Sequence, residues 1–246
     1  MSVKQSTGLR DAIARAIRNI YQDMVLKIYT GTAPATADMA ATGTLLCTFS
    51  KASGEVSPGE VSTAKEAMVA VASHGSGETF TVTINGVDYT FTNTPDLDAI
   101  PVAKALAALV DADPLVEAHA CGTVNIYIRS RIAGLNFTIA VGGTGTLNLT
   151  DDAVANVDAD TLNFGVPAAG VLGKHADVWS GVAVAGGVAG YGRLVKSDDD
   201  GTLSTTQPRL QGNVAVSGQE ITLSNTTITA GATQTIDAGN ITVPAS

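Results

Sequence analysis

Three histidines and two cysteines are the side chains best suited to catalysis or metal binding in this chain. His74, His119 and His175 are far apart, and only His119 has a cysteine, Cys121, two residues away. Side chains two apart on a strand point to the same face, so this pair supplies half of a soft-metal site. Because the sequence offers no second pair to complete four ligands, we expect ordinary structural roles and no metal or cofactor.

An acidic run at residues 198–201 (DDDG) is similar to the start of a calcium-binding loop. An EF-hand also needs spaced ligands and a terminal glutamate, but the next acidic residue after Gly201 is Glu220. Aspartate and glycine are common turn residues, so the run predicts a solvated turn between strands. Bound calcium stays an open alternative.

The short motifs of common enzymes are missing from the sequence. It contains no GxSxG nucleophile elbow, no P-loop, no HExxH zinc motif, and no GxGxxG between a strand and a helix. We therefore expect no enzyme and name no catalytic or cofactor-binding residue. A hydrolase whose paired carboxylates converge across loops stays open as an alternative.

The amino-acid composition argues against several classes of protein. The chain of 246 residues has 14 Lys and Arg against 23 Asp and Glu, a net charge of −9, with 45% apolar and 15% charged residues. This balance excludes a chain that is disordered throughout, and it argues against a protein that binds nucleic acid through its phosphates. The charge-free residues 132–150 are interrupted by glycines and alternate in polarity, so we expect no membrane segment.

Apolar residues near the start recur at spacings of three and four and predict an amphipathic helix with Thr7 as its N-cap. Its basic residues Arg10, Arg15 and Arg18 are candidates for a subunit interface, in which the helix docks against an acidic neighbour instead of packing on its own domain. Trp179 is a further candidate interface residue, with a core position as its alternative. The apolar stripe comprises Leu9, Ala12, Ile13, Ala16, Ile17, Ile20, Tyr21 and Met24.

The middle segment, residues 66–160, alternates in polarity around one short helix. Asn85-Gly86 separates two alternating runs and predicts a type I′ hairpin. The helix is expected to follow an N-cap at Asp98. Two strands, the helix and further strands together predict a small α+β domain. Its expected strands after the helix cover residues 116–121, 123–129, 137–141 and 146–149.

The two flanking segments, residues 1–65 and 161–246, contain short runs rich in Thr, Ser and Val with closely spaced turns. This pattern predicts a β-sandwich or jelly-roll-like platform that both segments build together. Strands rich in Thr and poor in charge are also typical of surfaces covered by neighbouring copies. The expected strands cover residues 25–30, 43–49, 178–184, 189–196, 209–216, 220–223 and 226–228.

Net charge also differs between the middle segment and the two flanking segments. Residues 66–160 contain three basic and twelve acidic residues, whereas the flanking segments contain eleven of each. All of the net charge therefore belongs to the middle segment. We expect a mainly β protein in which a neutral platform with an N-terminal helix carries an inserted, acidic, solvent-facing α+β domain.

Three stretches resemble a recurrent virion protein of tailed bacteriophages: KIYTGTAPATADMAATGTLLCTFS, GVAGYGRLVKSDDDGT and LQGNVAVSGQEITLSNTTITAGATQTI. The stretch TFTVTINGVDYTFTNTPDLDAIPVAKALAALVDADPLVEAHACGTVNIYI is similar to small add-on domains of phage tail and other virion proteins. The resemblance implies a non-enzymatic building block of the virion, present in many copies at the neck, the tail or the capsid surface. Its implied partners are other copies of the chain and other virion proteins.

The alternative function is a host-surface or carbohydrate-binding adhesin module, because β-sandwich domains often present ligand loops at one end. Aromatic residues make up only 4% of the chain, which leaves few rings to stack on sugars. A host surface is therefore a further candidate partner. Whether Cys47 and Cys121 form disulfides between chains is also left open.

Overall fold

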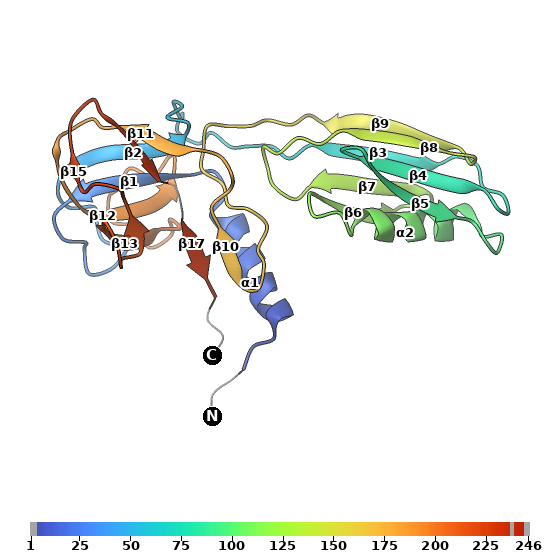
Figure 1. The fold of residues 1–246 in the computed structure, drawn as a ribbon, viewed down its shortest axis with the longest axis horizontal. Coiled ribbons are helices and arrows are strands. Elements are labelled where there is room, and N and C mark those ends of the chain that lie inside the picture. The colour runs from blue at the N-terminus through green and yellow to red at the C-terminus, as the bar shows by residue number, and fades with distance from the viewer. Residues whose placement is uncertain (1–3, 237–238, 244–246) are drawn as a thin grey trace. The chain divides into compact units, whose positions relative to one another are not determined.

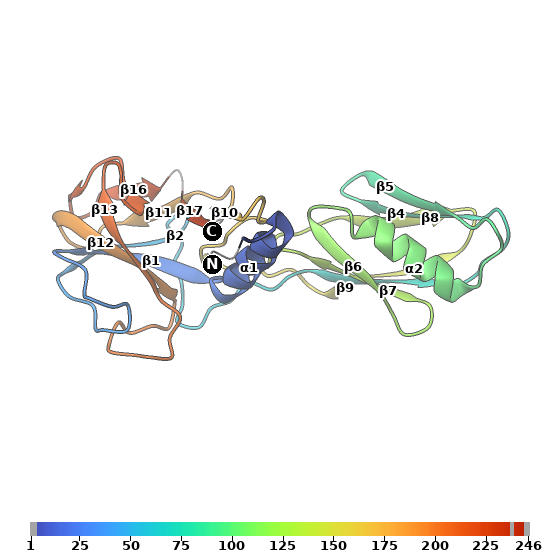
Figure 2. The same cartoon turned by 90° about the horizontal axis from the view of Figure 1, so that it is seen from below.

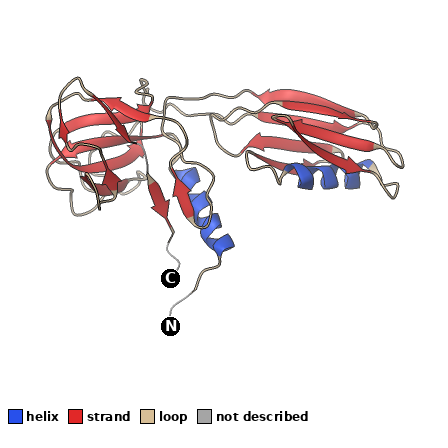
Figure 3. Ribbon diagram, in the orientation of Figure 1, coloured by secondary structure: helices blue, strands red, loops and turns tan. Residues whose placement is uncertain are grey.

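Strands make up most of the regular structure. The computed structural model describes residues 4–236 and 239–243, and in them we find seventeen strands and two helices (Figure 3). The expectation of a mainly β protein is confirmed. The chain divides into two compact units: unit 1 runs to Val61 and resumes at Ala159, and unit 2 is Ser62–Asp158. Neither described helix is long and apolar enough to cross a membrane.

Unit 1 is built on one eight-stranded sheet (Figure 1). Seven of its strands follow the order β14-β13-β12-β1-β2-β11-β16, and β15 pairs with β12. A separate pair consists of β10 (Val171–Gly173) and β17 (Asn240–Thr242). The strands of the large sheet are β1 (Met24–Thr30), β2 (Leu45–Lys51), β11 (Trp179–Val182), β12 (Gly187–Lys196), β13 (Leu210–Ala215), β14 (Ile221–Thr222), β15 (Thr227–Ile228) and β16 (Thr233–Ile236).

Pairing of β1 with β12 joins the two segments that form unit 1. The strands are antiparallel, with Met24 opposite Lys196 and Tyr29 opposite Tyr191. Consecutive residues of β1 are buried, so both faces of this strand are covered, as its nearly continuous apolar sequence requires. The core around it includes Leu26 of β1 and residues of the other strands, among them Leu46, Phe49, Leu194 and Ile236.

Helix α1 (Thr7–Ile20) starts one residue earlier than expected. Its N-cap is Ser6, whose Oγ accepts a hydrogen bond from the Leu9 N–H at 3.2 Å. Thr7 is therefore the first helical residue, and the prediction that it is the cap was wrong. A serine and a threonine in succession give the same capping signal, and only the backbone angles distinguish them.

The side of α1 that packs on unit 1 is also rotated from the expected stripe. Leu9 and Ile20 are each 50% exposed. The carboxylate of Asp11 accepts a hydrogen bond from the Gly170 N–H at 2.6 Å, and this contact fixes the rotation of the helix. The residues that are buried or that pack against the core are Ile13, Ala14, Ile17, Arg18 and Tyr21.

Unit 2 contains two smaller sheets and one helix, α2 (Ala99–Val110), as Figure 2 shows. The sheets have the orders β6-β7-β3-β9 and β5-β4-β8. Helix α2 contacts strands of both sheets and buries Val102, Leu106 and Val110 in their common core. The strands are β3 (Glu66–Val71), β4 (Thr79–Ile84), β5 (Val87–Thr92), β6 (Val116–Cys121), β7 (Asn125–Ser130), β8 (Ile139–Gly143) and β9 (Leu147–Val154).

The strands expected in the middle segment lack one strand that the structure contains. Strand β3 precedes the hairpin and lies between β7 and β9 in its sheet. Its sequence, EAMVAV, alternates between half-buried and buried residues. Alanine and glutamate have low β propensity, so pairing on both sides, and not local preference, makes this segment a strand. The short strands β10, β16 and β17 were not predicted either.

The hairpin between β4 and β5 confirms the turn prediction. Asn85 has a φ of 47° and Gly86 a φ of 83°, so both central residues have the positive angles of a type I′ turn. The Asn85 side chain also accepts a hydrogen bond from the Thr138 N–H at 2.8 Å, which links the turn to the segment before β8. The turn thus helps to hold the three-stranded sheet together.

Substitution of Gly86 by alanine tests the positive angle alone, because no atom lies within 4 Å of the position that its Cβ would take. We expect Gly86→Ala to lower the free energy of unfolding by about 1–2 kcal/mol, measured by urea denaturation. Gly142→Ala is the matched control, since it has equally open surroundings and no positive φ. Equal effects of the two substitutions would contradict the turn assignment.

Candidate functional site

The residues best suited to chemistry do not gather in the structure. His119 lies on β6 with its ring 5.0 Å from that of Tyr127, and Cys121 follows at the end of the same strand. His175 contacts the carboxylate of Asp177 through Nδ1 at 2.6 Å, within unit 1. In the part of the chain that the structure describes, no three His, Cys, Asp or Glu side chains are placed to hold a metal ion.

Asp199 differs from the solvated turn residue expected at residues 198–201. It is only 3% exposed, and its two carboxylate oxygens accept hydrogen bonds from Arg209 at 2.6 and 2.7 Å. Oδ1 also accepts from the Gly201 N–H at 2.7 Å. The prediction of a solvated turn was therefore wrong for Asp199, because Arg209 covers it, whereas Asp200 is exposed.

Electrostatics keeps the Asp199 carboxylate ionised. Burial opposes its ionisation, but the hydrogen bonds from Arg209 and Gly201 outweigh burial and hold the pKa of Asp199 below its usual value. The ammonium group of Lys27 lies close by and donates to the Asp199 carbonyl oxygen at 2.7 Å. Arg209 and Asp199 therefore form a charged, bidentate pair inside unit 1.

Side chains of β12, of β13 and of the residue before β13 hold the long 31–44 loop, which connects β1 and β2. We name four of them the clamp: Tyr191, Arg193, Arg209 and Gln211. Arg193 donates to the carbonyl oxygen of Met39 at 2.7 Å, and Gln211 donates to that of Pro34 at 2.8 Å.

The other two clamp residues also donate hydrogen bonds to carbonyl oxygens of the 31–44 loop. Arg209 donates to the carbonyl oxygens of Ala37 and Asp38 at 3.4 and 3.3 Å, and the Tyr191 hydroxyl donates to the Thr42 carbonyl oxygen at 2.6 Å. A loop without regular structure is thus held by side-chain donors along its length. Loops that a rigid scaffold positions in this way commonly carry recognition.

Two backbone hydrogen bonds tie a second loop to the clamped one. The Ser204 N–H donates to the Asp38 carbonyl oxygen at 2.9 Å, and the Ala41 N–H donates to that of Gly201 at 2.8 Å. Each loop exposes one large apolar side chain, Met39 at 45% and Leu203 at 72%.

A second surface of unit 1 is formed by the ends of β11 and β12 and by the strands paired with them. Val182, Val184 and Val188 are 51%, 70% and 61% exposed. Val182 is directly opposite Thr233, and Val188 is directly opposite Thr227, so each pair shares a face of its sheet. We name these five residues the Val/Thr face.

Backbone hydrogen bonds extend the pairing of β11 with β16 beyond Val182 and Thr233. The Gly231 N–H donates to the Ala183 carbonyl oxygen at 2.8 Å, and the Ala183 N–H donates to that of Ala232 at 3.0 Å. No charged residue occurs in the sequence from 178 to 192 or from 221 to 236. The segments that carry the Val/Thr face are therefore uncharged, and the side chains of the face are short.

The structure does not bring the four candidate interface residues together on one exposed surface. Arg15 is exposed on α1, whereas Arg10 is half-buried and Arg18 is 8% exposed. Trp179 is 4% exposed and packs edge-on against Phe164, with ring centroids 5.4 Å apart. Of the four, only Arg15 is an exposed residue.

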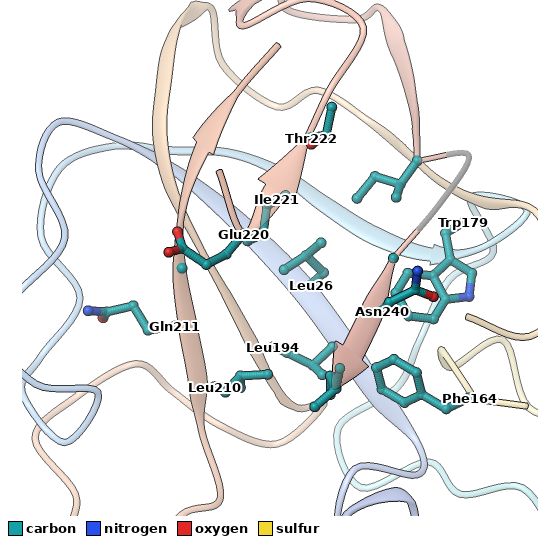
Figure 4. Close-up of a pocket in the computed structure, with 14 residues that line it drawn as sticks. Leu26, Phe164, Trp179, Leu194, Leu210, Gln211, Glu220, Ile221, Thr222 and Asn240 are labelled. Atoms are coloured by element: carbon teal, nitrogen blue, oxygen red, sulfur yellow. The ribbon is translucent and has the colours of Figure 1, made fainter. Parts of the chain in front are cut away.

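Trp179 also lines a pocket of about 220 Å³ in unit 1 (Figure 4). The pocket was not predicted, because its walls come from strands that are far apart in the sequence. The clamp was not predicted either, although the polar residues Arg193, Arg209 and Gln211 within strand patterns were a usable signal of buried hydrogen bonding.

A scan of protein-family models finds none that matches the chain, and a search of curated proteins also finds no match.

Loss of the Asp199 charge tests the clamp. We expect Asp199→Asn to lower the free energy of unfolding by about 3 kcal/mol near neutral pH, because Arg209 is left buried without its counter-charge. The pKa of Asp199 is lowered in the folded state, so this stabilisation is present above its unfolded pKa of about 4 and is lost as pH falls through the folded value. Urea denaturation from neutral to acid pH should show the two proteins converging at the acid end.

The matched control for this test is Asp200→Asn, which neutralises the exposed neighbouring carboxylate. It should change stability much less than Asp199→Asn. Equal losses, or a loss that does not depend on pH, would contradict the role of the buried pair.

Thiol reactivity tests the burial of the cysteines. Cys47 is fully buried, and burial raises the pKa of its thiol to about 11, whereas Cys121 is half-buried. We expect a thiol reagent at neutral pH to modify one cysteine per native chain and both in denaturant. Cys121→Ser should remove the native reaction and Cys47→Ser should leave it. A fast reaction of Cys47, or its pairing in a disulfide between chains, would contradict the structure.

Proposed function

We propose that the chain is a structural component of a tailed-phage virion that assembles in multiple copies at the neck, the tail or the capsid surface. In this proposal unit 1 is a β-sandwich or jelly-roll-like platform, and unit 2 is an inserted domain that adds acidic surface. The chain acts as a building block without catalysis, and its partners are other copies of itself and other virion proteins. The resemblance of its sequence to virion proteins of tailed phages is the starting point.

The observation that carries the proposal is the Val/Thr face. Charged residues are depleted from the centres of protein interfaces, because their desolvation is costly. Valine and threonine lose less side-chain entropy on burial than lysine or glutamate. An exposed sheet surface that is meant to stay in water usually carries charges that prevent association, and the Val/Thr face has none.

The distribution of charge supports the same division of roles. Unit 2, residues 62–158, contains four basic and eleven acidic residues, whereas unit 1 contains ten basic and twelve acidic residues. Copies of unit 2 therefore repel one another, and copies of unit 1 are close to neutral. Contact between copies is favoured through unit 1.

Introduction of a charge on the Val/Thr face tests assembly. We expect the chain to form oligomers of defined size in sedimentation velocity, and Val184→Lys to weaken their association by at least about tenfold, because the lysine charge would be buried without a partner. Val87→Lys is the matched control, since Val87 is 54% exposed on unit 2. A wild-type chain that stays monomeric at its highest soluble concentration, or equal effects of both lysines, would contradict assembly through this face.

The location in a virion needs a separate test. Mass spectrometry of purified particles of the phage that encodes the chain should find peptides of both units at a constant ratio to the major capsid protein. Peptides that are present in the lysate but missing from intact particles would overturn the proposal.

A further inference from the structure

The pocket of unit 1 lies where the two ends of the eight-stranded sheet approach each other. Ile221 of the end strand β14 and Ile236 of the other end strand, β16, both line it. Leu26 of β1 and Leu194 of β12 contribute from the middle of the sheet. One pocket is thus enclosed by strands from both ends of the sheet order.

Apolar side chains form most of the pocket wall. Its volume of about 220 Å³ exceeds the roughly 150 Å³ of an apolar cavity that is known to take up benzene. A ring system larger than benzene, or a short alkyl chain, therefore fits. The apolar lining residues are Leu26, Phe164, Trp179, Leu194, Leu210, Ile221, Ile236 and Ile241.

One charged residue, Glu220, is among the residues that line the pocket. Figure 4 shows its side chain on the side of the pocket opposite Trp179. Oε2 of Glu220 accepts a hydrogen bond from the Asn213 N–H at 3.0 Å, which holds the carboxylate in place. Glu220 is an exposed residue, and no hydrogen bond to its Oε1 occurs among the described residues.

We propose that this pocket binds a small organic amine with an aromatic or alkyl body. The apolar body lies among Leu26, Leu194 and Trp179, and the ammonium group lies beside Glu220. Burial of the body supplies most of the affinity, and the carboxylate selects a cation over an anion of the same shape. This binding site belongs to unit 1 alone and is independent of the proposed role in a virion.

Three probes with the same ring system test the charge preference: 1-naphthylmethylamine, 1-naphthylmethanol and 1-naphthoate. Trp179 is the one tryptophan of the chain, so its indole N–H gives a single cross-peak in a ¹H–¹⁵N correlation spectrum. We expect saturable shifts of this peak by the full chain, with the amine binding tightest and the naphthoate weakest. Glu220→Gln should weaken binding of the amine by about two- to fivefold and leave the alcohol unchanged.

Two further variants test whether the probes bind in the pocket and not elsewhere on unit 1. Glu55→Gln removes an exposed carboxylate of unit 1 that does not line the pocket, and it should leave all three affinities unchanged. Ile221→Phe fills the pocket from its edge and should abolish the shift, while the dispersion of the spectrum shows that the protein stays folded.

Three results would overturn the proposal. The first is that no probe shifts the indole peak up to its solubility limit. The second is that the three probes bind equally, or that Glu220→Gln has no effect on the amine. The third is an indole shift that depends on protein concentration without probe, because it would assign the pocket to a side chain of a second copy.

Discussion

The pairing of β1 with β12 is the interaction on which unit 1 depends. It joins residues 24–30 to residues 189–196, and the whole of unit 2 lies between them in the sequence. Every other strand of the large sheet is attached to this pair, directly or through one or two intervening strands. Because loop-closure cost grows only slowly with length, a long intervening segment is compatible with such a sheet. The clamp, the Val/Thr face and the pocket all use residues of β12 or of strands and loops attached to it.

The clamp connects the sheet built on the β1–β12 pair to the 31–44 loop. Arg193 of β12 and Arg209, the residue before β13, donate hydrogen bonds to carbonyl oxygens of the 31–44 loop, which contains no helix or strand. Asp199 supplies the counter-charge that makes burial of Arg209 tolerable. The order of an alanine- and threonine-rich loop thus rests on charged side chains that lie more than 150 residues away in the sequence from the loop residues they contact.

Features set by neighbouring residues could be predicted from the sequence. The Asn85-Gly86 turn and the helix that follows Asp98 depend on local preferences, and both are present. Features set by distant residues could not be predicted. The rotation of α1 depends on Asp11 meeting Gly170, the burial of Asp199 depends on Arg209, and the pocket needs strands from both halves of unit 1. Low charge in the last strands indicated a covered surface, but only the structure identifies which valines are exposed.

Together these observations describe a chain whose net negative charge lies mostly on unit 2, whereas the Val/Thr face lies on unit 1. Hydrogen–deuterium exchange of the chain at high and at low concentration tests most directly whether copies meet at the Val/Thr face. Our account predicts that assembly slows exchange in residues 182–188 and 227–233, and leaves residues 85–92 of unit 2 unchanged. Slower exchange confined to unit 2 or to α1, with residues 182–188 unaffected, would contradict it.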